Sequence, residues 1–202
     1  MGLVKANRSV DEHAPAQAED LSAALTDADA TTRRRAARAL GERREGADLL
    51  CTRLEAEPDA AVRSAIAAAL LRQPSPDVAR HLVGLLRSEE AAVRNQAIEL
   101  LAAMPEAVAP LIEGILNDPD SDIRIFGVNV LASLASPEVP GWLIALIEHE
   151  PHVNVCAAAV DVLAEVGAPD ALPALRRLAV RFAGEAFLRF SIQVAIDRIG
   201  LE

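Results

Sequence analysis

A segment of twelve residues recurs six times along this 202-residue chain, and its spacing constrains the fold more than any other feature. The fifth position of the segment, called the slot below, holds arginine in five copies and cysteine in one. Successive slots lie 30, 31, 30, 32 and 33 residues apart, which is too regular for chance. The copies are DATTRRRAARAL (29–40), DAAVRSAIAAAL (59–70), EAAVRNQAIELL (90–101), DSDIRIFGVNVL (120–131), HVNVCAAAVDVL (152–163) and EAFLRFSIQVAI (185–196). Such a period predicts an array of similar units.

A second helical pattern lies between the copies. It begins with a proline that is followed by an acidic residue, at Pro76, Pro105, Pro137 and Pro169. Proline at the first helical position loses no intrahelical hydrogen bond, and the acid suits the positive end of the helix dipole. Each unit is therefore predicted to be helix A, a turn and helix B, the recurring segment. Since neither helix can bury its apolar face alone, the prediction is an all-α, right-handed solenoid (superhelix) of about six stacked repeats.

Composition limits the classes of function. Alanine and leucine enrichment favours helix, and four Phe, one Trp and no Tyr leave few rings for base-stacking sites. The net charge of −10 disfavours binding to nucleic acid or to an anionic membrane. Residues 1–101 hold 14 basic and 16 acidic side chains, and residues 102–202 hold 6 and 14. The acidic excess is thus concentrated in the second half.

The ends of the chain differ from its repetitive part. Residues 1–18 lack periodicity and are predicted to form a mobile N-terminal arm, before a single repeat domain over residues 19–200. Leu201 and Glu202 resemble the remnant of an expression vector. No apolar run approaches the roughly 18 residues of a membrane span, and the N-terminus lacks the apolar stretch of a signal peptide. We therefore expect a cytosolic protein.

The pattern D-x-x-V-R-x-x-A-x-x-A-L in helix B, with AVAPLIEGIL (107–116) and ALPALRRLA (171–179) in helix A, resembles the HEAT-like repeats of the phycobilisome-lyase type. The resemblance covers about residues 19–199. It implies a structural ladder in which acidic residues and arginines of successive repeats tie each helix B to its neighbours. The residues implied are Asp29, Arg33, Asp59, Arg63, Glu90, Arg94, Asp120, Arg124 and Arg189. His152 and Cys156 depart from the pattern, so the ladder is expected to be interrupted in the fifth repeat.

The chemistry of the arginine slot agrees with a structural role. A guanidinium has a long apolar stem and five donors, which suit carboxylates and orphan carbonyls at once. We favour a structural tie over contact with a ligand. Cys156, which fills the same slot, is interpreted as a small buried hydrophobe rather than a nucleophile. Three stacked repeats would hold it about 30 Å from Cys51, too far for a disulfide.

No catalytic residue, metal site or cofactor is predicted. His149 and His152 lie near Glu148 and Glu150, but Pro151 breaks the helix that would align them, so a solvated turn is favoured over a metal site. An iron-dependent hydroxylase family with HEAT-like repeats relies on several His-Glu pairs. This chain has one such pair, His149-Glu150, which argues against that activity.

Helix B also predicts where a partner binds. Apolar columns are formed by the residues one position before the slot and three, six and seven positions after it. The residues one, two and five positions after the slot should face outward. These outward columns vary between repeats, as expected of a concave surface shaped for one partner. The candidate contacts are Arg34, Arg35, Arg38, Asn95, Gln96, Glu99, Ile125, Phe126, Asn129 and Asp161, with Ser64, Ala68, Ala157, Phe190, Ser191 and Val194 in the same columns.

Three alternatives stay open on this surface. The cluster RRRAAR (33–38) is either a solvated face or a patch for an acidic partner. Phe126 is either an apolar anchor, together with Ile125, or a side chain tucked between repeats. Phe190 either belongs to the binding surface or caps the core of the last repeat.

The sequence favours a non-catalytic interaction module that binds a protein or peptide on its concave helix B face. We expect a monomer or weak homodimer with no cofactor, no nucleic-acid partner and no membrane attachment. The alternative that the family resemblance suggests is a bilin lyase-like or other enzyme-accessory subunit. A DNA-lesion binder on the same fold is disfavoured by the negative charge and the scarcity of aromatic residues.

Overall fold

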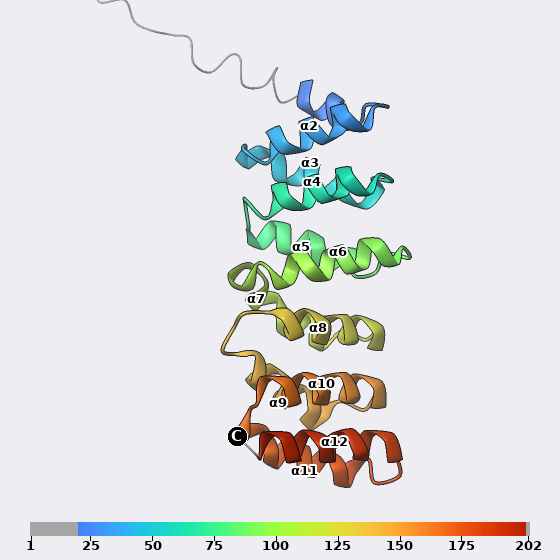
Figure 1. Cartoon of the computed structure of the whole chain (residues 1–202), viewed down its shortest axis with the longest axis vertical. Helices are drawn as coiled ribbons and strands as arrows, with labels where there is room; N and C mark the ends of the chain where they lie inside the picture. The colour runs from blue at the N-terminus through green and yellow to red at the C-terminus, as the bar shows by residue number, and fades with distance from the viewer. Residues whose placement is uncertain (1–19, 201–202) are drawn as a thin grey trace, which may run out of the picture. The chain divides into compact units, whose positions relative to one another are not determined.

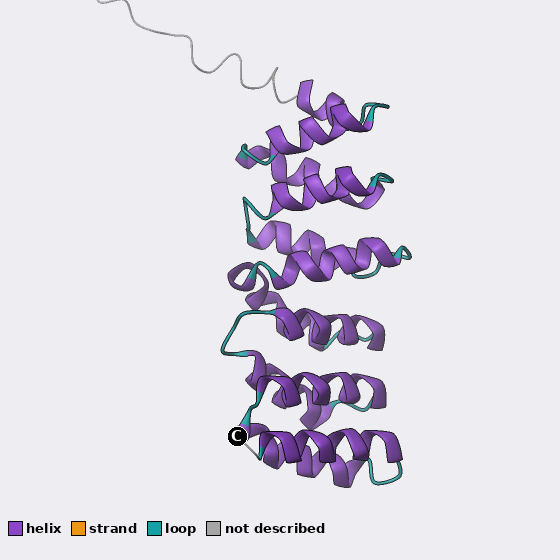
Figure 2. Cartoon of the chain, in the orientation of Figure 1, coloured by secondary structure: helices purple, strands orange, loops and turns teal. Residues whose placement is uncertain are grey.

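The computed structural model describes residues 20–200, and the predicted N-terminal arm and vector remnant lie outside them. The chain divides into two compact units, Met1–Gln73 and Pro74–Glu202, called unit 1 and unit 2 below. Within residues 20–200 the regular structure is entirely helical, so the predicted all-α class is confirmed (Figure 2). No helix in this described range combines the length and apolar character needed to cross a membrane.

Unit 1 holds the first two repeats. Residues 20–25 are helical and precede α2 (Ala30–Leu40); a short 3-10 turn, η1 (Arg44–Gly46), leads into α3 (Ala47–Ala56) and α4 (Ala60–Leu70). Helix α2 packs along α4, and α3 packs against α4 (Figure 1). Asp29 and Asp59 cap α2 and α4 by accepting backbone N–H groups of the first turn, which explains the acid at the start of each copy.

Unit 2 holds four repeats as helix pairs. The helices are α5 (Pro76–Leu85), α6 (Ala91–Ala102), α7 (Pro105–Leu116), α8 (Ser121–Ser133), α9 (Val139–His149), α10 (Val153–Val166), η2 (Pro169–Ala171), α11 (Leu172–Arg181) and α12 (Ala186–Ile199). The B helices α6, α8, α10 and α12 pack in series, and the A helices α5, α7, α9 and α11 do the same (Figure 1). This is the alternation that the two sequence patterns predict.

Two helix starts differ from the prediction. Helices α5 and α7 begin at Pro76 and Pro105 as expected, but α9 begins at Val139 and α11 at Leu172. In both, a second proline occupies the first turn of the α-helix, where a missing N–H group costs no hydrogen bond. A start at Pro137 or Pro169 would move that second proline deeper into the helix. Pro110 shows that α7 nevertheless tolerates one such interior proline.

The apolar columns of helix B form the core of each unit. All the residues at the four predicted core positions are buried except Thr32, Ala39 and Ile196, which belong to the first and last copies. Fully buried leucines such as Leu70 in unit 1 and Leu131 in unit 2 each contribute about 1.5–3 kcal/mol by leaving water. Gly127 lies in the same column because α7 approaches α8 closely there; a Cβ atom would lie 2.6 Å from Ile115 Cγ2.

Candidate interaction site

The slot arginines bind the turn of their own repeat. In four repeats the Nη1 atom donates to two carbonyl groups, five and six residues earlier, in the turn between helix A and helix B. The pairs of acceptors are Asp27 and Ala28 for Arg33, Glu57 and Pro58 for Arg63, Ser88 and Glu89 for Arg94, and Asp118 and Pro119 for Arg124. Arg189 donates to the carbonyl of Ala183. Each guanidinium therefore satisfies carbonyl groups of the turn, which lie outside both helices and have no helical partner.

Two slot arginines also reach the next repeat. Arg33 donates from Nε and Nη2 to the carboxylate of Glu57, at 2.9 and 2.8 Å. Arg124 makes the same two-bond pair with Glu150, at 2.7 and 2.8 Å. Both glutamates lie in the turn one repeat further on, so these pairs join neighbouring repeats within each unit. The geometry is the bidentate arrangement that favours arginine over lysine.

The acids that tie the repeats are not those that the resemblance implies. Asp29, Asp59 and Asp120 accept N–H groups of their own helices, and the side chain of Glu90 makes no capping bond. The partners are the two glutamates that precede Pro58 and Pro151, in the sequences EPD and EPH. That Glu-Pro pair, two residues before the start of a copy, was a signal that the sequence analysis missed.

The environment of both glutamates favours the charged form. Burial alone would raise the pKa of Glu57, but the Arg33 and Arg53 side chains and the backbone N–H of Asp59 bind the carboxylate and lower its pKa to about 2. At Glu150, burial is likewise outweighed by Arg124 and the N–H of His152, so its pKa is lowered. These are charged groups fixed for structure rather than poised for proton transfer.

The fifth repeat replaces the slot arginine with a cation from elsewhere. The Cys156 side chain is buried, and its Sγ lies 3.5 Å from the carbonyl O of Glu150. Arg181, at the end of α11, donates to the carbonyls of Ile147, Glu148 and Glu150. The expected interruption at the slot is present, but the turn is still bound by a guanidinium.

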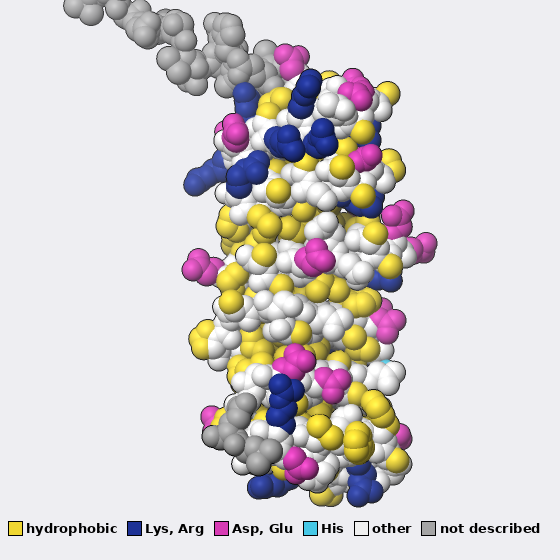
Figure 3. Space-filling model, viewed as in Figure 1, with side chains coloured by type: hydrophobic (Ala, Val, Ile, Leu, Met, Phe, Trp, Pro, Cys, Tyr) yellow, Lys and Arg dark blue, Asp and Glu magenta, His cyan; other side chains and the backbone are white. Residues whose placement is uncertain are grey.

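The candidate contacts on helix B are all accessible. None of the candidate contacts is buried within its unit, but Ala65, two residues after the slot of the second copy and so in an outward column, is buried. Arg35, Arg38, Asn95, Glu99, Asn129 and Asp161 are exposed, as are Ser64, Ala68, Phe190 and Val194, whereas Arg34, Gln96, Ile125, Phe126, Ala157 and Ser191 are half-buried. Basic side chains gather on the face of unit 1 that Figure 3 shows. The arginines belong to unit 1, and the candidates from Asn95 onward belong to unit 2.

The aromatic candidates differ from each other. The Arg94 guanidinium lies 5.5 Å from the ring centroid of Phe126, so one face of this half-buried ring carries a cation–π contact. Phe126 is therefore partly tucked against the neighbouring repeat and partly accessible. Phe190 is 69% exposed on α12, an exposure that does not fit a cap on the core of the last repeat.

Across residues 20–200, no three His, Cys, Asp or Glu side chains are placed to hold a metal ion. His149 and His152 are both exposed at the turn after α9. Cys51 and Cys156 are free and buried, and burial raises the pKa of each thiol to about 11. Little thiolate therefore exists at neutral pH.

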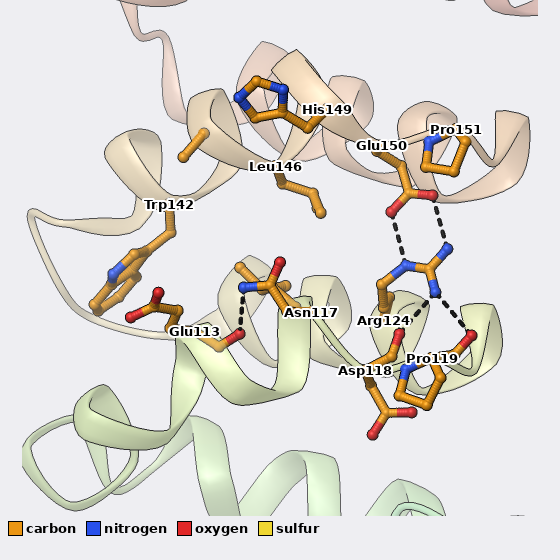
Figure 4. Close-up of a pocket in the computed structure, with 12 residues that line it drawn as sticks. Glu113, Asn117, Asp118, Pro119, Arg124, Trp142, Leu146, His149, Glu150 and Pro151 are labelled. Atoms are coloured by element: carbon orange, nitrogen blue, oxygen red, sulfur yellow. Dashed lines mark hydrogen bonds and ion pairs between the residues drawn. The ribbon is translucent and has the colours of Figure 1, made fainter.

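A groove of about 640 Å³ lies in unit 2, between the repeat of α7 and α8 and the repeat of α9 and α10. Its walls come from the C-terminal part of α7, the following turn and α9. Figure 4 shows Glu113 and Trp142 at one end of the groove and the Arg124–Glu150 pair at the other. Leu116 and Leu146 contribute apolar surface. The groove was not predicted from the sequence, because its side chains converge from two repeats.

Comparison with known proteins places the chain in a family. Residues 18–106 and 108–184 match the family model for HEAT repeats, so the chain belongs to the HEAT-repeat family. No curated protein matches it. The resemblance drawn from the slot pattern is therefore confirmed at the level of the repeat.

Several solved structures are similar to this chain. They include the archaeal HEAT-like repeats protein from Thermococcus onnurineus NA1, at 18% identity, with 93% of this chain and 88% of that chain covered and a TM-score of 0.49. Human deoxyhypusine hydroxylase in complex with glycerol is 20% identical, with coverages of 92% and 85% and a TM-score of 0.47. The complex of CpcE and CpcF of phycocyanin lyase from Nostoc sp. PCC7120 is 19% identical, with coverages of 97% and 100% and a TM-score of 0.36.

Proposed function

We propose that this HEAT-repeat protein is a non-catalytic interaction module that binds a protein or peptide through the outward columns of its B helices. The observation that carries the proposal is the contrast between columns of the same helices. Core columns are buried in the four inner copies and hold small or apolar residues, whereas the candidate contacts named from the outward columns are all accessible and change from arginine to amide to apolar side chains. Accessible side chains that vary on a regular framework suit recognition of one particular surface.

Each unit would contribute a different kind of contact. In unit 1, Arg34, Arg35 and Arg38 would meet acidic groups, because an accessible guanidinium group can bind a carboxylate through two parallel hydrogen bonds. In unit 2, Ile125 and Phe126 would anchor apolar side chains of the partner, since accessible apolar groups leave water when a partner covers them and a few such anchors carry most of the binding energy of an interface. The raised thiol pKa of both cysteines also favours binding over nucleophilic chemistry.

A defined acidic peptide tests the basic part of this surface. Fluorescence anisotropy would follow binding of a labelled peptide of alternating glutamate and leucine. Arg35→Glu should weaken binding several-fold, since rim charges contribute roughly 0.2–1 kcal/mol each and reversal adds repulsion. Arg44→Glu is the matched control, because Arg44 is also exposed in unit 1 but lies outside helix B. If both variants weaken binding equally, the peptide is attracted by the general charge of unit 1 and is not bound by helix B.

A further inference from the structure

The groove between α7 and α9 contains one carboxylate without a cation. Three acidic side chains line it, and two of them are neutralised by arginines. Glu150 pairs with Arg124, and Asp118 forms an ion pair with Arg87. For the Glu113 carboxylate, no ion pair or side-chain hydrogen bond occurs among residues 20–200. It is an exposed negative charge at the rim of the groove.

The wall beside this carboxylate is aromatic. Trp142 of α9 is half-buried, and Figure 4 shows its indole at the same end of the groove as Glu113. Indole is the aromatic ring that binds cations most strongly, through its negative face. Its ring and the apolar side chains of Leu116 and Leu146 would cover the methylene stem of a long basic side chain. The carboxylate would then bind the charged end.

We propose that this groove binds the lysine or arginine side chain of a basic peptide, with Trp142 and Glu113 as its recognition residues. The charge of unit 2 agrees with this occupant, since residues 74–200 carry 9 Arg against 17 Asp and Glu and no Lys. A volume of about 640 Å³ exceeds the space of one side chain, so neighbouring residues of the peptide can enter as well. The site lies at the interhelical turn and is separate from the outward columns of helix B.

The sole tryptophan of the chain gives a direct readout. An unlabelled peptide of alternating lysine and alanine, added at physiological ionic strength, should change the emission of Trp142 saturably. Its counterpart with glutamate in place of lysine should leave the emission unchanged. The absence of any change with the lysine peptide would overturn the proposal.

Matched substitutions separate the site from general charge attraction. With the lysine peptide labelled and followed by anisotropy, Glu113→Gln and Trp142→Leu should each weaken binding about three- to fivefold. Glu106→Gln removes the same charge from an exposed position of α7 that does not line the groove, and should leave binding unchanged. Far-UV circular dichroism establishes that each variant is folded. Equal weakening by Glu113→Gln and Glu106→Gln would overturn the proposed site. Displacement of the peptide by an equal concentration of spermidine would also overturn it, because the groove would then bind a small polyamine instead of a peptide.

Discussion

Arg181 of α11 holds its Nη2 atom 3.9 Å from the Sγ atom of Cys156 in α10. The same atom donates to the carbonyl of Ile147, in the last turn of α9, and to that of Glu150, in the turn that precedes α10. Elsewhere the slot arginine of the repeat itself binds the turn. A guanidinium therefore binds the turn in all six repeats, and at the fifth, where the slot residue is small, it comes from the following repeat.

An arginine introduced at the fifth slot tests whether Arg181 takes the place of the missing slot arginine. Cys156→Arg should destabilise the protein by about 1–3 kcal/mol, because a larger side chain enters a filled space and two guanidinium groups compete for the carbonyl of Glu150. Urea denaturation followed by circular dichroism measures the free energy of unfolding. The double variant with Arg181→Ala should recover part of the loss, since the two changes are coupled. Strictly additive losses would show that the two side chains do not share one role.

The buried pair of Arg33 and Glu57 predicts a second stability effect. Their side chains are 8% and 0% exposed, and the Glu57 carboxylate also forms an ion pair with Arg53. Glu57→Gln should cost about 3–5 kcal/mol, because it leaves the Arg33 charge buried without its counterion. Glu55→Gln, which removes an exposed acid at the end of α3, two residues before Glu57, is the matched control and should change the free energy of unfolding little.

The same pair predicts a loss of stability in acid. The pKa of Glu57 is about 2 in the folded protein and near its ordinary value of 4.5 in the unfolded chain. Since the unfolded state binds the proton first, the stability from Glu57 is complete above about pH 4.5 and is lost as the pH falls towards 2. Denaturation at a series of pH values should show a smaller acid-induced loss in Glu57→Gln than in the parent. An unchanged slope between pH 4.5 and 2 would contradict this assignment.

The parts of the fold that can be predicted from the sequence are those determined by residues that lie close together in the chain. Helix B and its core columns follow from periodicity, and the structure confirms the burial of these columns in the inner repeats. Capping by Asp29 and Asp59 also has a local cause, although the resemblance had placed these acids in the ties between repeats. The ties between repeats have a different origin. Glu57 lies 24 residues from Arg33 and Glu150 lies 26 residues from Arg124, and each pair depends on how turns of adjacent repeats meet. The groove at Trp142 is unpredictable from sequence for the same reason.

The last helix, α12, carries both exposed and buried large apolar side chains, and substitutions can distinguish their contributions to stability. Phe187 and Phe190 are 71% and 69% exposed on α12, whereas Leu188 between them is fully buried. Leu188→Ala should cost about 2–5 kcal/mol through lost burial and the cavity that remains. Phe190→Ala should change the free energy of unfolding by less than about 0.5 kcal/mol, as surface substitutions do. A comparable loss in both variants would mean that Phe190 belongs to the core after all.

Unit 2 has two glycines inside helices whose replacement by alanine should change the free energy of unfolding in opposite directions. At Gly114 of α7 a Cβ atom would meet no atom within 4 Å, so Gly114→Ala should stabilise the helix by about 0.5–1 kcal/mol. At Gly127 of α8 the added Cβ would lie 2.6 Å from Ile115 Cγ2 and 3.2 Å from Leu116 Cδ2. Gly127→Ala should therefore be destabilising by about 1–3 kcal/mol, because overpacking exceeds the gain in helix propensity. Urea denaturation compares the two variants, and a stabilising Gly127→Ala would mean that α7 and α8 can separate there at little cost.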